Sequence, residues 1–468
     1  MIRSINARTV RCSWDVELGE AVDVLVIGGG PSGIGAAVAA ARLGARVTLI
    51  ERYGFLGGNL TAGLVGPCMT SYSLDGSRQL IRGLFEEFVQ RMIARGGALH
   101  PSTVAAGSPY SGFIDYGHDK VTPFEPEAAK AVALEMCLEA GVQLLLHTFT
   151  FDAIVRDGSV CGVLYLNKSG IGAMESAVTI DCSADGDVAA KSGARFQLGR
   201  DGDGLTQPMT LFFRVSGVDD ARVEQYVRTH PEDFRPFASL VARGRAEGRF
   251  PSPRKGVGMY KTLVDGVWRI NTTRVLGVVG TETEDLTKAE IEARRQAEGL
   301  VRFFRSDLPG FERCVLLDTA VTVGVRETRR VVGDYMLSVD DLVSGREFDD
   351  VIAAAGYPVD IHDPAGDGGG VEGAFRTANA YEIPYRCLLP AGLDRLLMAG
   401  RCVSATHEAL AAIRVMPPAF AMGEAAGTAA ALAVRDRTAP RQVRVEELQA
   451  QLIDQGAVLG HLLARSSS

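Results

Sequence analysis

The sequence lacks three features that would point to particular classes of protein. No apolar run approaches the roughly 18 residues that a membrane-spanning helix needs. Residues 1–20 contain three arginines but no continuous apolar core, which disfavours a signal peptide. The eight cysteines form no C-x-x-C pair, so neither a zinc site nor a redox-active dithiol is visible. These absences predict a cytoplasmic protein with no membrane span, disulfide framework or metal site.

Charge and length narrow the choice further. The chain has 468 residues, of which 46% are hydrophobic and 23% charged, and its formal net charge is −8. An acidic balance disfavours nucleic acid and anionic membranes as partners. Because a single hydrophobic core rarely serves a chain of this length, we expect two domains.

The strongest motif lies near the amino end. Residues 24–27 (VLVI) are an apolar run typical of a buried parallel strand, and residues 28–33 complete a G-x-G-x-x-G pattern. We expect a helix of small residues over 34–43, then a strand over 46–50 that ends at Glu51. A strand, a glycine turn, a helix and an acid in this order favour a dinucleotide-binding unit over a purely structural turn.

Each part of the motif has a physical role in such a unit. Gly28 permits the tight turn out of the strand, and Gly30 lets the backbone approach a pyrophosphate without a Cβ in the way. Gly33 allows close packing of the helix on the strand. The amino end of the helix offers N–H groups and a positive dipole to the phosphates, and Glu51 is placed to accept hydrogen bonds from a ribose diol.

The rest of the chain alternates regular elements with irregular stretches. Residues 96–122, rich in Gly, Pro and Ser, are a candidate cap over a cleft. From residue 193 the character changes, and Thr287 is expected to cap a helix over 288–304. The glycine run 366–370 is expected to be a flexible loop. Other expected elements are helices over 80–95, 125–140, 417–434 and 445–463, strands over 142–147 and 395–401, and a β-meander over 153–180.

Taken in order, a series of stretches resembles one family of flavoproteins. They are GGGPSGIGAA from Gly28, ERYGFLGGNLT from Glu51, FEPEAAK from Phe124, IDCSADGDVAA from Ile180, RETRRVVGDY from Arg326, YEIPYRCLLP from Tyr381, LLMAGRCVSATHEA from Leu396 and MGEAAGTAAAL from Met422. The set resembles the FAD-dependent oxidoreductases of the glutathione-reductase structural type that carry a single flavin domain. It implies an α/β fold: a doubly wound, Rossmann-like FAD domain from residues 1–192 and 385–468, with a mixed α+β substrate domain inserted at 193–384.

The resemblance also implies which residues hold the FAD. The glycine turn would bind the pyrophosphate, Glu51 the adenosine ribose, and the helix after Pro418 would direct its amino end at the flavin. Arg401 stands where related flavoproteins carry an aspartate, which is a difference from the family pattern. The implied cofactor-binding residues are Gly28, Gly30, Pro31, Ser32, Gly33, Glu51, Arg52, Gly57, Gly58, Asn59, Thr148, Phe149, Ala184, Asp185, Gly400, Arg401, Pro418, Ala419 and Met422.

A single dinucleotide fingerprint and the lack of a dithiol disfavour disulfide reduction. The resemblance implies a dehydrogenase or oxidase that transfers hydride from a small polar organic substrate to flavin N5. A flavin-dependent monooxygenase and a non-catalytic FAD-binding subunit are the alternatives. The electron acceptor is left open among oxygen, a protein carrier, a quinone and transiently bound nicotinamide, as is the formation of a homo-oligomer.

We select His407, Arg329 and Tyr385 as candidate catalytic residues. His407, which follows Arg401 by six residues, could accept the proton released with hydride transfer, or could hydrogen-bond the backbone instead. Arg329 could bind a substrate carboxylate in a bidentate fork, or pair with a nearby acid. Tyr385 could face an interdomain cleft or pack in the core.

Several neighbours share these alternatives. Like Arg329, Arg326 and Arg330 could bind a substrate carboxylate or form an ion pair with an acid of the protein. His362 could belong to the site or be a hydrogen-bonded loop residue, and solvated surface is the default for His118. Tyr381 and Arg386, near Tyr385, are also candidates for the cleft.

Overall fold

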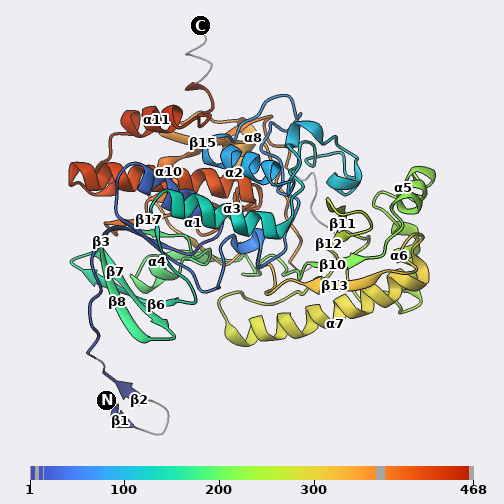
Figure 1. The fold of residues 1–468 in the computed structure, drawn as a ribbon, viewed down its shortest axis with the longest axis horizontal. Coiled ribbons are helices and arrows are strands. Elements are labelled where there is room, and N and C mark those ends of the chain that lie inside the picture. Colours follow the sequence, from blue (N-terminus) through green and yellow to red (C-terminus); the bar gives the residue numbers. More distant parts are fainter. Residues whose placement is uncertain (1, 6–9, 14, 365–374, 463–468) are drawn as a thin grey trace.

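A mixed sheet organises the larger part of the molecule (Figure 1). The computed structural model describes residues 2–5, 10–13, 15–364 and 375–462. The seven-stranded sheet has the order β5-β4-β3-β8-β7-β6, with β17 paired to β8. Its parallel strands are β3 (Val22–Ile27), β4 (Val47–Ile50), β5 (Gln143–Leu145), β8 (Gly170–Asp181) and β17 (Leu396–Met398). The predicted α/β class with a Rossmann-like sheet is confirmed.

The long strand β8 pairs antiparallel with one neighbouring strand and parallel with others. Up to Glu175 it runs antiparallel to β7 (Ser159–Asn167), which in turn pairs with β6 (Phe149–Arg156) in the predicted meander. From Ser176 onward β8 runs parallel to β3, and its last residues also pair with β17. The register places Ile27, Asp181 and Met398 level with one another, so the loops after three strands leave the sheet at one place.

Two helices pack tightly on each other beside this sheet. α1 (Pro31–Arg42) starts at a proline that needs no hydrogen-bond partner in the first turn, which places its start before the predicted residue 34. It packs against α10 (Met416–Asp436) through glycines. A Cβ on Gly423 would lie 2.0 Å from the Ser32 oxygen, and one on Gly427 would lie 2.1 Å from the Ala36 oxygen.

Further helices lie around this pair. α2 (Gly83–Ala94) and α3 (Pro126–Glu139) contact α1, and α11 (Val445–Asp454) contacts α10. The predicted extension of this last helix to residue 463 is wrong, because Gly456 has φ of +87° and ends it. The short helices α4 (Asp187–Lys191), α8 (Val339–Ser344) and α9 (His407–Ile413) begin directly after loops.

A second, antiparallel sheet with its own aromatic core occupies the opposite half of the molecule (Figure 1). Its order is β11 (Met259–Lys261), β12 (Trp268–Ile270), β10 (Phe213–Ser216), β13 (Val315–Thr319). The long helix α7 (Thr283–Asp307) contacts β13, and α5 (Asp220–Thr229) and α6 (Ala238–Ala246) lie at the far end. The predicted cap Thr287 is inside α7, where its hydroxyl donates to the Thr283 oxygen 2.8 Å away.

Three two-stranded pairs complete the described strands. β9 (Phe196–Leu198) pairs with β14 (Arg329–Val331), and β15 (Val351–Ala355) pairs with β16 (Tyr381–Pro384). β1 (Ile2–Ile5) and β2 (Val10–Cys12) form a hairpin that projects from the body (Figure 1). The predicted glycine loop at 366–370 lies outside the described residues. No helix in the described ranges is both long and apolar enough to cross a membrane.

The hydrophobic cores follow the two sheets. The larger core surrounds the seven-stranded sheet and also takes side chains between Val331 and Ile383. The aromatic core lies between Phe213 and Cys314. The division into 1–192 with 385–468, and 193–384, stays a prediction.

We expect Gly427→Ala to lower the free energy of unfolding of the protein by about 1–3 kcal/mol, because the new methyl group overlaps the α1 backbone. Helix propensity alone predicts the opposite sign, with a gain of about 1 kcal/mol for alanine over glycine. Urea unfolding followed by circular dichroism measures the change. A more stable variant would show that α1 and α10 can separate at little cost.

Candidate cofactor and substrate site

A cavity of about 220 Å³, here called the sheet-edge cavity, opens where β3, β8 and β17 end. It lies at the start of α1 and also reaches the loop after β4. Of the residues predicted to hold the cofactor, Gly33, Gly57, Pro418 and Met422 do not line it. Those that do are Gly28, Gly30, Pro31, Ser32, Glu51, Arg52, Gly58, Asn59, Thr148, Phe149, Ala184, Asp185, Gly400, Arg401 and Ala419.

The glycines of the fingerprint differ in what surrounds them. Gly28 has φ of +100°, and a Cβ there would lie 2.4 Å from the Cys182 oxygen, while one on Gly33 would lie 1.8 Å from the Gly28 oxygen. These two positions serve the packing of the turn itself. A Cβ on Gly30, in contrast, would meet nothing closer than the Cα of Gly58 at 3.9 Å. Gly30 therefore leaves open space on the cavity side.

The amino end of α1 is available to a ligand. Within the described chain, no side chain caps this helix at Gly30. The first N–H groups of an α-helix have no partner inside the helix, and the helix dipole makes this end positive. An uncapped helix end beside an open glycine is the arrangement that binds a phosphate group.

Glu51 is held in a fixed orientation at the wall of the cavity. Its Oε2 accepts a hydrogen bond from the Gly29 amide at 2.7 Å, and its Oε1 accepts one from the Tyr53 amide at 2.9 Å. Burial raises the pKa of its carboxyl, against the lowering effect of these amides. Each oxygen keeps a second acceptor site, so the side chain can still receive hydroxyl groups of a ligand.

Arg401 is neutralised by an acid from another strand end. Its Nη2 lies 2.7 Å from Asp185 Oδ1, and its Nη1 donates to Thr328 Oγ1 at 2.8 Å. The Thr328 hydroxyl in turn donates to Asp185. Asp185, after β8, thus places a carboxylate directly beside Arg401.

The three candidate catalytic residues line neither this cavity nor the one described below. Arg329 donates to Asp187 Oδ1 at 2.8 Å and to the Asp185 oxygen at 3.1 Å. Tyr385 is buried and donates to the Pro440 oxygen at 2.9 Å, and burial raises the pKa of its hydroxyl. Arg329 thus pairs with a nearby acid, and Tyr385 packs in the core, as the alternative interpretation of each residue expected.

His407 belongs to a buried ionic network. It begins α9 and is 4% exposed, and its Nδ1 lies 2.8 Å from Glu327 Oε2. Glu327, which is fully buried, also pairs with Arg330 and accepts the Gln207 amide at 3.1 Å. Arg330 donates further to the oxygens of Ala405 and Gly199. The network joins segments that are far apart in the sequence.

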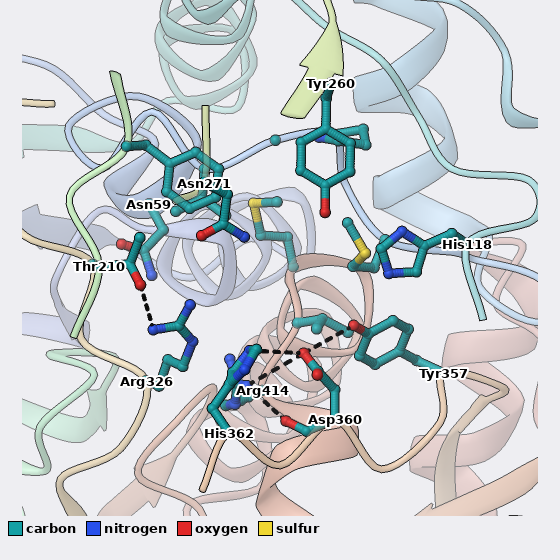
Figure 2. Close-up of a pocket in the computed structure, with 18 of the residues that line it drawn as sticks. Asn59, His118, Thr210, Tyr260, Asn271, Arg326, Tyr357, Asp360, His362 and Arg414 are labelled. Carbon is teal, nitrogen blue, oxygen red and sulfur yellow. Dashed lines mark hydrogen bonds and ion pairs between the residues drawn. The ribbon is translucent and has the colours of Figure 1, made fainter. Parts of the chain in front are cut away.

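A second cavity, of about 130 Å³, adjoins the first and is here called the arginine cavity. The two share Asn59, Val325, Arg414 and Met416. Figure 2 shows side chains from several segments converging on one space. Its charged and titratable lining residues are His118, Arg235, Arg254, Tyr260, Arg326, Tyr357, Asp360, His362 and Arg414.

Arg326 and His362 are site candidates from the sequence, whereas His118 was expected at the solvated surface and the other residues of this set were missed. Arg235, Arg254 and Tyr260 stand in stretches without a recognisable motif, and only the fold brings them together. Asp360 stands two residues before His362, and that proximity was the one available signal.

Arg326 is a buried cation without an acidic partner. The residue is 8% exposed, and its Nη1 donates to the Pro208 oxygen and to Thr210 Oγ1. Among the described residues, no carboxylate forms an ion pair with it. Burial lowers the pKa of Arg326 well below its usual value, and the charges of Arg274 and Arg414 lower it further.

Asp360 and His362 form a coupled pair on the cavity wall. Arg274 Nη2 lies 3.0 Å from His362 Nδ1, and because a guanidinium only donates, that nitrogen accepts. His362 Nε2 lies 3.4 Å from Asp360 Oδ2, which also accepts from the Tyr357 hydroxyl at 3.2 Å. Burial, with the arginine charges, lowers the pKa of His362 well below its usual value. The imidazole is therefore neutral, with its proton on Nε2.

Asp360 is ionised. Burial alone would raise the pKa of its carboxyl, but contact with His362 and the charge of Arg414 lower it well below the usual value. Arg414 Nη2 lies 3.2 Å from the Asp360 backbone oxygen and 3.8 Å from Oδ2. The cavity thus combines several cations with one ionised acid.

The model of the family "FAD dependent oxidoreductase" matches residues 23–452 of the chain. No curated protein sequence matches this chain. The chain is similar to a geranylgeranyl bacteriochlorophyll reductase-like protein from Thermoplasma acidophilum (13% identity, TM-score 0.44, covering 95% of this chain and 86% of that one). It is also similar to the p-nitrophenol 4-monooxygenase from Pseudomonas putida (14% identity, TM-score 0.44, 94% and 84%).

We expect Arg330→Met to lower the free energy of unfolding by about 3–5 kcal/mol, because it removes the arginine charge from the buried Glu327 and leaves only His407 paired with it. The matched control is Arg329→Met, which breaks the partly exposed pair with Asp187 and costs at most about 1 kcal/mol. Urea unfolding of the protein stripped of small ligands compares them. Equal losses would mean that the Glu327 network contributes no more than a surface pair.

Proposed function

We propose, on the premise that this chain belongs to the family of FAD-dependent oxidoreductases, that it is a dehydrogenase or oxidase of a small polar organic substrate. FAD binds in the sheet-edge cavity and the substrate in the arginine cavity. The observation that carries the proposal is the contact between the two cavities, which share Asn59, Val325, Arg414 and Met416. A substrate in the second would lie directly beside a cofactor in the first.

The residues around the sheet-edge cavity suit the parts of FAD. Gly28 to Gly33 and the amino end of α1 would hold the pyrophosphate, and Glu51 would accept the hydroxyls of the adenosine ribose. The segment at Thr148 and Phe149 would contact the adenine, and the loop from Gly57 to Asn59 would lie along the flavin. When bound, the flavin supplies an acceptor for hydride at N5.

The remaining contacts come from the carboxyl-terminal part of the chain. Ala184 and Asp185 would lie on the adenosine side, and Gly400 with Arg401 along the ribityl chain and phosphate. Met416 and Ala419 bring the start of α10 to the cavity. Because Pro417 and Pro418 have no N–H, this helix end would act through its positive dipole rather than through donated hydrogen bonds.

Asp360 is the proposed proton acceptor. Oxidation of an alcohol or amine by hydride loss also releases a proton from the substrate hydroxyl or amino group, and an unprotonated side chain must take it. Asp360 lines the substrate cavity, and its surroundings keep it ionised. His362 donates toward its Oδ2 and so positions the carboxylate. His407 is not assigned this role, because it pairs with Glu327 and lines neither cavity.

We expect Gly30→Ala to weaken FAD binding at least tenfold while the stability of the apoprotein changes by about 1 kcal/mol or less. The added Cβ finds room in the folded chain but occupies the space where the pyrophosphate would lie. Flavin fluorescence titration measures the affinity, and urea unfolding measures the stability. Gly33→Ala is the matched control, since its methyl group collides with the Gly28 backbone and should destabilise the fold itself. Undiminished FAD affinity in Gly30→Ala would contradict the assignment.

The proposed reaction is tested by anaerobic reduction of the bound flavin. A panel of alcohols, amines and hydroxy or amino acids is mixed with the holoenzyme, and the loss of absorbance near 450 nm is followed. We expect one of them to reduce the flavin without NAD(P)H, and Asp360→Asn to slow that reduction by about 10²–10⁴-fold. Because the variant loses a negative charge, its affinity for an anionic substrate should not fall.

Asp363→Asn, which removes an acid outside both cavities, serves as the control and should reduce at the normal rate. Flavin reduction that required NAD(P)H and gave a hydroxylated product would replace the proposal with a monooxygenase. An unchanged rate in Asp360→Asn would remove that residue from the mechanism.

A further inference from the structure

The charge of the arginine cavity indicates the chemical class of its ligand. Arg235, Arg254, Arg326 and Arg414 reach its wall from four separate segments, and Asp360 is the one acid among the lining residues described. Arg414 is offset by Asp360. Arg326 lines the cavity and forms no ion pair with a carboxylate among the described residues, so its charge favours an anion over a neutral ligand in this space.

Arg326 is the residue that carries this argument. Bringing a guanidinium out of water is costly unless an anion or a full set of acceptors compensates it. One nitrogen of Arg326 donates to two neutral oxygens, and no acid of the described chain pairs with the charge. The neighbouring arginines Arg329, Arg330 and Arg401 differ, since each has a carboxylate partner. Arg326 lies at the wall of the arginine cavity (Figure 2).

A second buried arginine, Arg269, shows how the protein itself can stabilise a guanidinium that has no carboxylate partner. Arg269 also lacks an acidic partner among the described residues, but its guanidinium lies 4.8 Å from the centre of the Phe124 ring and donates to the Phe124 oxygen. It lines neither cavity. Arg326 has no contact with an aromatic ring among the described residues, and it does line a cavity. Asp360 acts on the charge of Arg326 without an ion-pair contact, so the direct carboxylate contact of this guanidinium is available to a ligand.

The position of Arg326 indicates that its ligand is the substrate and not the cofactor. It lines the arginine cavity and not the sheet-edge cavity, so an anion paired with it lies on the substrate side. Asn271 lies across the same space (Figure 2). Its Oδ1 is buried and has no hydrogen-bond partner within the described residues. An acceptor in that place suits a hydroxyl or amino group on the same ligand.

We infer that the substrate is a small organic acid whose carboxylate binds Arg326 and whose hydroxyl or amino group faces Asn271. This inference rests on the proposed function, because only that function makes the bound acid a substrate. Binding of an anion at the site can be measured without turnover. The planar guanidinium matches a carboxylate in a two-point contact. A neutral amide of the same shape presents an N–H₂ group to the guanidinium and leaves the charge uncompensated.

Binding of unreactive anions to the FAD-loaded enzyme tests the inference. Acetate, oxalate and malonate are titrated calorimetrically at constant ionic strength, beside acetamide, oxamide and malonamide. We expect at least one acid to bind at least tenfold more tightly than its amide. Arg326→Met should abolish that preference and leave amide binding unchanged. Arg295→Met, which removes an exposed arginine of α7, should bind as the native chain does.

Two further measurements keep the test decisive. Arg326→Lys retains the charge but not the fork, so it should bind the acid with intermediate affinity, and it serves where the methionine variant fails to fold. The same titration with FAD-free protein gives a readout that does not depend on the cofactor. Equal affinity for acids and amides in the native protein, or full acid binding in Arg326→Met, would overturn the inference. Failure of every compound to reduce the flavin, with acid binding intact, would overturn the proposed function alone.

Discussion

The register of β8 is the constraint on which the rest of the structure depends. One strand pairs antiparallel with β7 up to Glu175 and parallel with β3 from Ser176, so the meander and the parallel sheet share a single rigid element. Because β17 pairs with the same last residues, three strand ends stay level. A slip of one residue would turn every inward side chain of β8 outward and would separate the loops that line the sheet-edge cavity.

Arginines serve two purposes in this fold, and their partners distinguish them. Arg401 joins distant segments by pairing with Asp185, and Arg330, which pairs with the nearby Glu327, joins them by donating to the oxygens of Ala405 and Gly199. Such a pair costs much desolvation and adds little net stability, but breaking it exposes a buried charge to a large penalty. Arg326 is also buried, yet it donates its hydrogen bonds to neutral oxygens. The same residue type therefore acts as a structural tie in one place and as an open binding group in another.

The sequence was informative where structure is local and uninformative where chemistry is assembled over long distances. A strand, a glycine turn and a helix obey short-range steric rules, so residues 22–51 could be predicted closely from the residues themselves. Thr287 looked like a cap but lies inside α7, because the acidic turn before it also forms helix. His407 stands next to a recognisable motif, yet only the fold reveals Glu327 beside it. Arg235 and Tyr260 carry no local signal, since nothing in their own segments marks a cavity.

The ionised state of Asp360 links substrate binding to its proposed task. Contact with His362, with the charges of Arg414 and Arg326, holds the pKa of Asp360 well below its usual value, so the carboxylate would be a weak base. An anionic ligand beside Arg326 offsets part of that positive field, which raises the pKa of Asp360 toward the range where a base works well. If the carboxylate took a proton in the proposed reaction, Arg414 would lose its counter-charge at the boundary of the two cavities. Under the proposed function, the charge of Arg414 would then face the sheet-edge cavity, so the same arginines would serve both substrate recognition and proton transfer.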